Sequence, residues 1–208
     1  MVSLTKIRTS WNKPNKEIVN LLNGLGINGF RFPGGTDKAT LHNYTGIYSY
    51  LLDQYRYMDC KLLEIGVRQG GSALLWHEYM PSVYMYLVDI EDKVNKRIRK
   101  QLDENRFTFY KIDAYSENAL RTLDKNKYHV IIDDGSHAPD DILFVADRYY
   151  RLLEPGGVMI LEDIPDEGLL QKLTNLFSPE QQKGINIFDV RESGRWDDLV
   201  WAITKEAA

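Results

Sequence analysis

Apolar runs alternate with segments of helical character along most of the chain. The runs are KLLEIGV, VYMYLVDI, FTFYKIDA, YHVIIDDG and GGVMILEDI. Continuous apolar runs of this length are typical of strands buried on both faces, and their alternation with helices predicts a mostly parallel sheet covered on both sides. Two further runs, INIFDVRE and DLVWAITKE, flank the polar loop SGRWD and predict a C-terminal antiparallel hairpin. We therefore expect an α/β fold with a seven-stranded, mostly parallel sheet.

The chain before the first strand lacks this alternation and predicts a helical arm. Pro14 can begin a short helix that runs through Leu22, and the glycines of NGLGINGFRFPGG then end it. Apolar residues at helical spacing predict a second helix at about residues 41–57. We expect an N-terminal arm at residues 1–57 and a core at residues 58–208, within one structural domain overall.

Composition narrows the class of protein. Of the 208 residues, 43% are hydrophobic and 27% are charged, which is typical of a globular chain and not of a disordered one. The formal net charge of -4 argues against a protein that binds nucleic acid through a basic face. The charged segment EDKVNKRIRKQLDEN is expected to be a helix with a solvated outer face.

The sequence lacks several features that would indicate a secreted or membrane protein, and these absences guide the expected cellular compartment and partners. A single cysteine, Cys60, excludes an internal disulfide framework and a cysteine zinc cluster. No apolar run approaches the roughly 20 residues that span a bilayer, and the N-terminus lacks the apolar region of a signal peptide. We expect a cytoplasmic protein with no membrane or nucleic-acid partner.

Polar residues gather where the predicted strands end. In open parallel sheets the ligand lies beyond the carboxyl ends of the strands, where the strand order reverses. The first such turn runs from Glu64 through Gly66 and Gly70 to Ser72, and its glycines would let a ligand approach the backbone. In the alternative interpretation, the glycines of this turn bind no ligand and only allow the following helix to pack on the strand. The spacing differs from the GxGxxG of nicotinamide enzymes.

The next two strands each end in an aspartate. Asp89 lies 23 residues after Gly66, where a carboxylate can accept hydrogen bonds from the hydroxyls of an adenosine ribose. Its alternative role is to cap the helix that follows. Asp113 and Ala114 end the third strand, where they can face an adenine; for Asp113 a capping role is the competing interpretation.

The fourth and fifth strands end in acidic residues. Asp134 and Asp163, 29 residues apart, are expected to enter one crevice, where a divalent cation such as Mg²⁺ would relieve their repulsion. His137 follows closely and could take a proton from a substrate hydroxyl. The alternative is that Asp134 and Ser136 cap the next helix and that His137 is an exposed surface histidine.

These residues resemble a known group of enzymes. The stretch DDGSH followed by LEPGGVMILED is similar to the sugar O-methyltransferases of the macrocin and mycinamicin type, with the related rhamnosyl O-methyltransferases. Gly35 to Lys38, with His42, Tyr44 and Tyr48, resembles the segment that precedes the fold in that group, and LLEIGVRQGGSALLW resembles its first motif.

The resemblance implies a Rossmann-like class I methyltransferase fold that moves a methyl group from S-adenosylmethionine to a sugar hydroxyl, with Mg²⁺ or another divalent cation. It implies that Asp134 and Asp163 bind the metal, with Glu162 or Asp133 as a further acidic ligand, and that His137 is the general base. A lid over the cofactor would come from the arm. The residues expected to contact the cofactor are Thr36, Lys38, Tyr44, Glu64, Gly66, Arg68, Gly70, Ser72, Asp89, Asp113, Ala114 and Asp133.

Three other functions compete with this one. A metal-dependent methyltransferase of catechols or other phenols would use the same residues, although the histidine favours a less acidic sugar hydroxyl. A nicotinamide-dependent oxidoreductase and a domain that only binds a ligand fit the glycine spacing and the paired acids less well. The acceptor is expected to be a deoxyhexose such as rhamnose in a glycan or glycoside, and the chain a homo-oligomer or part of a larger glycan-building polypeptide.

Overall fold

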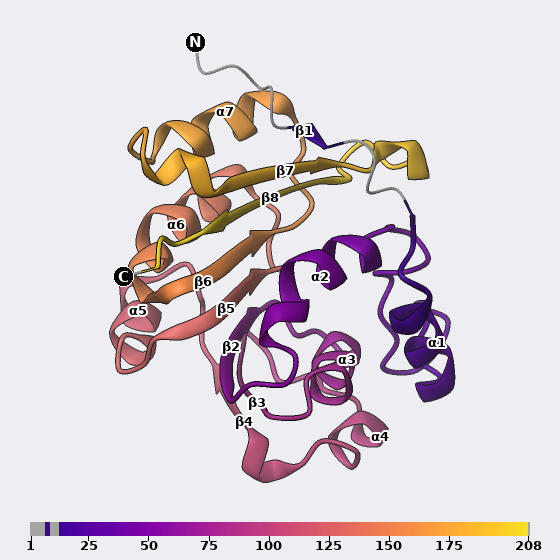
Figure 1. Ribbon diagram of the computed structural model, residues 1–208. Coiled ribbons are helices and arrows are strands. Elements are labelled where there is room, and N and C mark those ends of the chain that lie inside the picture. The colour runs from indigo at the N-terminus through magenta and orange to yellow at the C-terminus, as the bar shows by residue number, and fades with distance from the viewer. Residues whose placement is uncertain (1–6, 9–12, 208) are drawn as a thin grey trace.

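One sheet runs through the molecule, and its strand order creates a crevice at a defined place. The computed structural model describes residues 7–8 and 13–207 (Figure 1). The strands are β1 (Ile7–Arg8), β2 (Cys60–Ile65), β3 (Val83–Asp89), β4 (Phe107–Lys111), β5 (Tyr128–Asp133), β6 (Leu153–Leu161), β7 (Ile185–Asp189) and β8 (Leu199–Thr204), in the order β1-β7-β8-β6-β5-β2-β3-β4. The chain moves outward from β2 to β4 and then returns to β5 on the other side of β2. The strand order therefore reverses between β2 and β5.

The seven expected strands and the C-terminal hairpin are confirmed. Strand β8 runs antiparallel to both β6 and β7, and the other strand pairs are parallel. The two-residue strand β1 extends the sheet beside β7, in a segment where the sequence predicted only a helical arm. The rest of the beginning of that arm, residues 1–6 and 9–12, lies outside the described residues.

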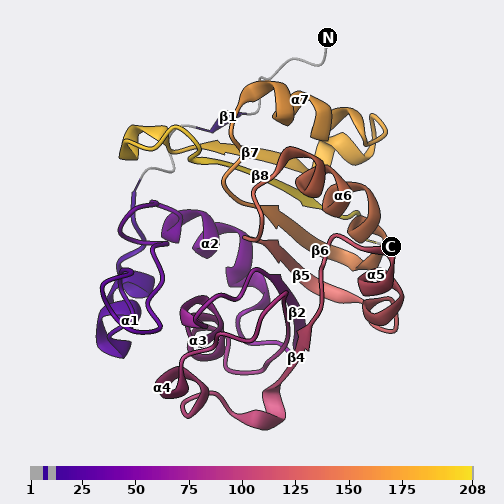
Figure 2. The same cartoon turned by 180° about the vertical axis from the view of Figure 1, so that it is seen from behind.

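Helices cover both faces of the sheet. Helices α1 (Lys16–Leu25), α2 (Thr45–Leu52) and α3 (Gly71–Tyr79) pack on one face, and α5 (Glu117–Leu123), α6 (Pro139–Tyr149) and α7 (Glu167–Asn175) pack on the other (Figures 1 and 2). Alternate residues of β2 divide between the two cores, since Leu62 belongs to the first and Leu63 to the second. Within residues 7–8 and 13–207, no helix has the length and apolar character needed to cross a bilayer.

The first helix of the arm begins and ends where the sequence predicts. The charged segment, in contrast, does not form the long helix that the sequence predicts. The side chain of Asn15 accepts a hydrogen bond from the Ile18 amide and caps α1, and Gly26 ends that helix with a φ of 64°. The expected second helix is shorter than residues 41–57, because α2 changes to a 3₁₀ turn at Asp53–Tyr55. In the segment 91–105 the one α-helix is α4 (Lys96–Arg99), where only Ile98 is buried. Leu102 of the same segment is also buried, but it lies beyond the end of α4.

The turn after β2 depends on a glycine. Gly66 has a φ of 88°, and a Cβ atom there would lie 2.0 Å from the backbone oxygen of Asp134. We expect Gly66→Ala to lower the free energy of unfolding by about 2 kcal/mol or more, because left-handed strain and a backbone clash add together. Urea denaturation measures this loss. The matched control is Gly24→Ala in α1, where no neighbour lies within 4 Å; an unchanged or raised stability is expected there. Equal effects at both positions would contradict the interpretation.

Candidate active site

The register of the strands places the polar residues at their carboxyl ends side by side at one edge of the sheet. Ile65 of β2 pairs with Asp133 of β5, and Asp133 pairs with Leu161 of β6. The residues that follow each strand therefore leave the sheet side by side. They open onto a cavity of about 320 Å³. The sequence-predicted residues that line it are Thr36, Gly66, Arg68, Ser72, Asp89, Asp134, His137 and Asp163.

A second, smaller cavity adjoins the first. It has a volume of about 180 Å³ and shares Gly66 and Asp89 with the larger one. Ala114, one of the predicted adenine contacts, lines this cavity beside Tyr115. Asp113 lines neither cavity; its side chain accepts a hydrogen bond from the Tyr115 amide. It does not cap α5, because that position belongs to Ser116.

Asp89 holds the glycine turn in shape. Its Oδ2 atom accepts hydrogen bonds from the amides of Val67 (3.0 Å) and Arg68 (2.8 Å). Its Oδ1 atom accepts from the Glu91 amide, and α4 is capped by Asn95 instead. The alternative role of Asp89 as a helix cap is therefore excluded for α4. Its carboxylate lies on the wall of both cavities, so contact with a ribose stays a prediction.

Glu64 lies beneath the turn with one oxygen unsatisfied. Trp76 Nε1 donates to its Oε1 atom at 2.9 Å, whereas Oε2 is buried without a hydrogen-bond partner in the described part of the chain. Burial raises the pKa of Glu64 to about 7. A buried carboxylate oxygen without a partner is costly, and a ligand amine nearby would satisfy it. Glu64 and Gly70 line neither cavity, and Gly70 is the N-cap residue of α3, with a φ of 87°.

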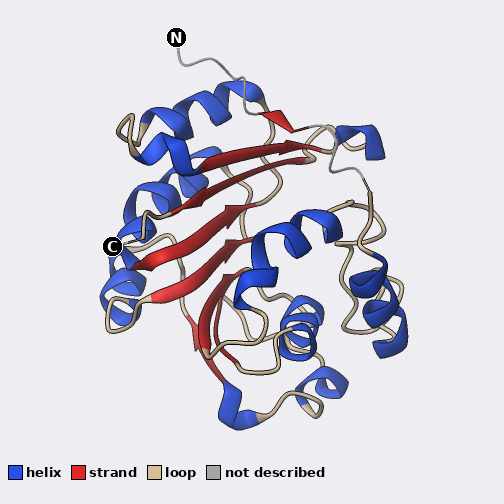
Figure 3. Cartoon of the chain, viewed as in Figure 1, coloured by secondary structure: helices blue, strands red, loops and turns tan. Residues whose placement is uncertain are grey.

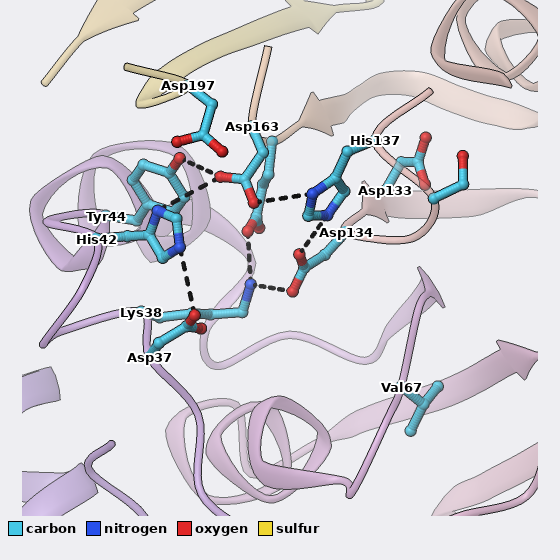
Figure 4. A network of polar contacts seen from close by, with 12 residues as sticks. Asp37, Lys38, His42, Tyr44, Val67, Asp133, Asp134, His137, Asp163 and Asp197 are labelled. Atoms are coloured by element: carbon cyan, nitrogen blue, oxygen red, sulfur yellow. Dashed lines mark hydrogen bonds and ion pairs between the residues drawn. The ribbon is translucent and has the colours of Figure 1, made fainter. Parts of the chain in front are cut away.

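The centre of the site is formed by two aspartates and a histidine (Figure 4). His137 Nε2 lies 3.3 Å from Asp134 Oδ1, and His137 Nδ1 lies 3.3 Å from Asp163 Oδ2. The hydrogen bond to Asp134 raises the pKa of His137 to about 9, against the opposing effect of burial. One ligand atom from each of these three residues lies within 4.8 Å of the others. The imidazolium occupies the space between the two carboxylates, and a divalent cation could take its place there, since carboxylate oxygens and a neutral imidazole nitrogen are donors that suit such a cation.

Lys38 and Glu162 face each other beside this centre. Lys38 Nζ lies 2.6 Å from Glu162 Oε2 and 2.9 Å from Asp134 Oδ2. The Tyr48 hydroxyl donates to Glu162 Oε1 at 2.5 Å, so both oxygens of Glu162 have partners. Burial alone would raise the pKa of Asp134, but Lys38 and His137 more than offset it and hold that pKa at about 2. The structure thus places Lys38 away from both cavities and Glu162 outside the group of three ligand residues.

Two further predicted residues also point away from the cavities. The Tyr44 hydroxyl donates to Asp163 Oδ1 at 2.5 Å, and Tyr44 is buried. Asp133 accepts a hydrogen bond from the Tyr115 hydroxyl at 3.0 Å, and burial raises its pKa to about 7. Both residues therefore support the carboxylates or the turn of the site rather than line it.

Sequence reasoning missed a cluster behind Asp163. His42 Nδ1 lies 2.6 Å from Asp198 Oδ1. The same nitrogen lies 3.4 Å from Asp163 Oδ1, and His42 Nε2 lies 3.3 Å from Asp37 Oδ2 (Figure 4). Burial opposes the charged form, but these carboxylates raise the pKa of His42 to about 10. The sequence motif that begins at Gly35 already included His42. No local sequence signal indicated Asp198, which lies 156 residues further along the chain.

Tyr115 connects the smaller cavity to the turn that carries His137. Its hydroxyl donates to Asp133 Oδ1 and accepts from the Ser136 amide at 2.8 Å. We expect Tyr115→Phe to lower the free energy of unfolding by about 1–3 kcal/mol, because a buried carboxylate and an amide both lose their partner. Urea denaturation tests this, with Tyr57→Phe as the control because Tyr57 is 75% exposed. A loss no larger than that of the control would contradict the role of the hydroxyl.

Backbone strain is concentrated at the same place. Arg68, His137 and Asp163 have φ angles of 49°, 57° and 53°, and they are the non-glycine residues with positive φ in the described ranges. All three follow strands and line the larger cavity. Residues in sparsely populated conformations cluster at functional sites in proteins, where the surrounding structure holds them. The strain thus makes this cavity the strongest candidate for the functional site.

Comparison with known proteins agrees with this geometry. Residues 63–164 match a protein family described as a methyltransferase domain. The chain is 30% identical over 148 residues to the 8-demethyl-8-alpha-L-rhamnosyl tetracenomycin-C 2'-O-methyltransferase of Streptomyces olivaceus, a match that covers 67% of this chain and 38% of the relative. It is 28% identical to the demethylmacrocin O-methyltransferase of Streptomyces fradiae, covering 61% of this chain and 33% of the relative. The chain thus spans less than half the length of these curated relatives.

Solved structures share the fold. The MycE methyltransferase from the mycinamycin biosynthetic pathway, solved in complex with Mg and SAH, superposes with a TM-score of 0.67 at 20% sequence identity. The superposition covers 94% of this chain and 56% of that protein. Taken together, these findings identify a methyltransferase domain at residues 63–164 with the class I methyltransferase fold, in a chain that resembles the macrocin- and mycinamicin-type sugar O-methyltransferases.

Proposed function

We propose that this chain moves a methyl group from S-adenosylmethionine to a hydroxyl of a sugar, with the aid of a divalent cation such as Mg²⁺. The observation that carries the proposal is the placement of Asp134, His137 and Asp163 on the wall of the cavity that the glycine turn and Asp89 also line. The names of the curated relatives describe O-methylation of sugars. A deoxyhexose such as rhamnose is the acceptor that we propose to test first.

The residues of the site fit both the methyl donor and the divalent cation. Asp89, whose carboxylate the Val67 and Arg68 amides hold in place, would bind the ribose hydroxyls of the methyl donor, and the buried Oε2 atom of Glu64 beneath the turn would suit an amino group that reaches it. Asp134 and Asp163 would hold the cation. When bound, the cation lowers the pKa of a coordinated hydroxyl, and the sulfonium donor supplies a methyl group that already carries its leaving group.

The remaining chemistry belongs to side chains of this protein. His137 lines the cavity and, in its neutral form, would accept the proton of the sugar hydroxyl as the oxygen bonds to the methyl carbon and the carbon–sulfur bond breaks. In the structure the two aspartates hold its imidazolium, one at each ring nitrogen, and the ring would become neutral, with one nitrogen free, once the aspartates bind the cation instead. Tyr44 and His42 fix Asp163 from behind, so that this carboxylate keeps its direction. Holding the oxygen and the methyl group together supplies much of the remaining acceleration.

Calorimetric titration tests the site directly. S-adenosylhomocysteine is titrated into the protein, followed by Mg²⁺ with and without EDTA, for the wild type, Asp134→Asn and the control Asp147→Asn on the surface of α6. We expect all three proteins to bind S-adenosylhomocysteine with micromolar affinity. The heat of Mg²⁺ binding should be present in the wild type and in Asp147→Asn and absent in Asp134→Asn. Cofactor binding without a metal response would remove the cation from the mechanism. No cofactor binding would overturn the methyltransferase proposal.

An acceptor screen separates sugars from phenols. Release of S-adenosylhomocysteine is followed with methyl α-L-rhamnopyranoside, other deoxyhexosides and catechol. Turnover of a rhamnoside supports the proposed acceptor class. Turnover of catechol alone would replace it by a phenol O-methyltransferase, which would use the same acidic centre.

A further inference from the structure

The turn that carries His137 is held in a strained conformation by a tyrosine from another part of the chain. His137 has a φ of 57°, which is unfavourable for a residue other than glycine. The amide of the preceding residue, Ser136, donates to the hydroxyl of Tyr115, which lies 21 residues earlier between β4 and α5. A strained turn persists only where the surrounding contacts determine it. This hydrogen bond therefore helps to fix the place from which His137 reaches the site.

The Tyr115 hydroxyl is itself fixed to the sheet. It donates to Oδ1 of Asp133 at 3.0 Å, and Asp133 is the buried last residue of β5. A Cβ atom on Gly135 would lie 2.0 Å from the hydroxyl oxygen, so the hydroxyl occupies the space that a side chain would need there. One oxygen atom thus joins a rigid strand end to the turn. Small displacements of a reacting group are costly in enzymes, so a contact of this kind matters for the base that the turn carries.

Tyr115 also forms part of the wall of the smaller cavity. Its hydroxyl is engaged by the two hydrogen bonds described above, so its aromatic ring is the part that is left to face a ligand. The smaller cavity adjoins the larger one along a shared wall, formed by Gly66, Asp89, Ile90 and Gly135. A flat apolar group in the smaller cavity, such as the adenine of the methyl donor, would pack against the ring.

We propose that Tyr115 is a positioning residue for His137 and that it links the nucleoside cavity to the catalytic turn. This inference rests on the proposed function, because it takes His137 as the base and the methyl donor as the ligand. A nucleoside base that packs on the ring of Tyr115 restricts that side chain, and its hydroxyl then holds the Ser136 amide more firmly. His137 is therefore more precisely placed when the smaller cavity is filled.

Hydrogen exchange followed by mass spectrometry tests the link without any turnover. Exchange is measured for peptides that cover residues 134–138, in the free protein and with saturating S-adenosylhomocysteine. We expect the ligand to slow exchange about fivefold or more in the wild type and less than about twofold in Tyr115→Phe. Tyr128→Phe is the matched control, because the buried Tyr128 donates to the Leu123 carbonyl at 3.0 Å at the opposite end of β5. It should respond as the wild type does.

A double-mutant cycle on kcat tests whether Tyr115 acts through His137. With an acceptor from the screen, Tyr115→Phe should lower kcat roughly 10- to 100-fold and change KM for the acceptor less than about threefold. In a His137→Asn background the same change should lower kcat less than about twofold, because the group that Tyr115 positions is already absent. Rates are measured at a temperature where urea denaturation shows every variant to be folded.

The outcomes separate this inference from the proposed function. Equal slowing of exchange in Tyr115→Phe and the wild type overturns the link to the nucleoside cavity. A loss of kcat that is just as large in the His137→Asn background, or in Tyr128→Phe, overturns the positioning role and leaves a structural one. These results overturn the inference alone. Failure of S-adenosylhomocysteine to bind would instead overturn the proposed function, and this inference with it.

Discussion

Replacing His137 by asparagine is expected to lower kcat for methyl transfer by roughly 10²- to 10⁴-fold, because the site loses the group that accepts the hydroxyl proton. Asparagine is the informative substitution, since His137 has a φ of 57° and asparagine tolerates the left-handed region better than most residues. The backbone of the turn should therefore persist. Initial rates of S-adenosylhomocysteine release, with an acceptor found in the screen, measure the loss.

Two controls show whether that loss belongs to proton transfer. Affinity for S-adenosylhomocysteine should change by less than about twofold, since the turn after β2 and Asp89 are untouched. Asp140→Asn, which alters an exposed acid at the start of α6, should leave kcat unchanged. A kcat for His137→Asn within threefold of the wild type would remove His137 as the base.

Replacing Lys38 by methionine is expected to lower the free energy of unfolding by about 3–5 kcal/mol. The Lys38 side chain is 2% exposed, and its ammonium group lies between the carboxylates of Glu162 and Asp134. Methionine fills a similar volume but leaves Glu162 buried without its cation. Removal of one member of a buried ion pair is costly because the partner cannot regain water.

A double-mutant cycle shows whether the pair is responsible. Lys38→Met combined with Glu162→Gln should recover a large part of the lost stability, because no buried charge is then left unpaired at that position. Urea denaturation of the wild type, both single variants and the double variant gives the coupling energy. A loss below about 1 kcal/mol in Lys38→Met, or strictly additive effects, would contradict the role assigned to the ion pair.

The strand ends were predictable because regular structure determines where they lie. Once the apolar runs are strands of a parallel sheet, the residues after them must meet at one edge, and the structure brings Gly66, Asp89, Asp134 and Asp163 to one cavity. Ala114 falls beside them for the same reason. Their chemical roles do not follow from position alone and stay predictions.

The supporting contacts were not predictable in this way. Lys38 meets Glu162 across 124 residues, and Tyr44 meets Asp163 across 119. These pairings depend on how the arm folds over the sheet, and no hydrophobic periodicity determines that path. The sequence therefore located the acids of the site but assigned Lys38 and Tyr44 to cofactor contacts, whereas the structure turns both toward carboxylates.

The strained turns have a consequence for laboratory evolution of this protein. Each of Arg68, His137 and Asp163 carries a left-handed penalty of roughly 1–2 kcal/mol, which glycine would relieve at an entropic cost of about 0.5–1 kcal/mol. At the exposed Arg68, a selection for heat resistance alone would therefore tend to accept glycine, whereas at His137 and Asp163 the lost ion pairs offset the relief of strain. Because Arg68 lines the cavity, such a selection would change the cavity wall while the fold grew more robust. Libraries for thermostable variants should hold these three positions fixed and diversify the outer helices instead.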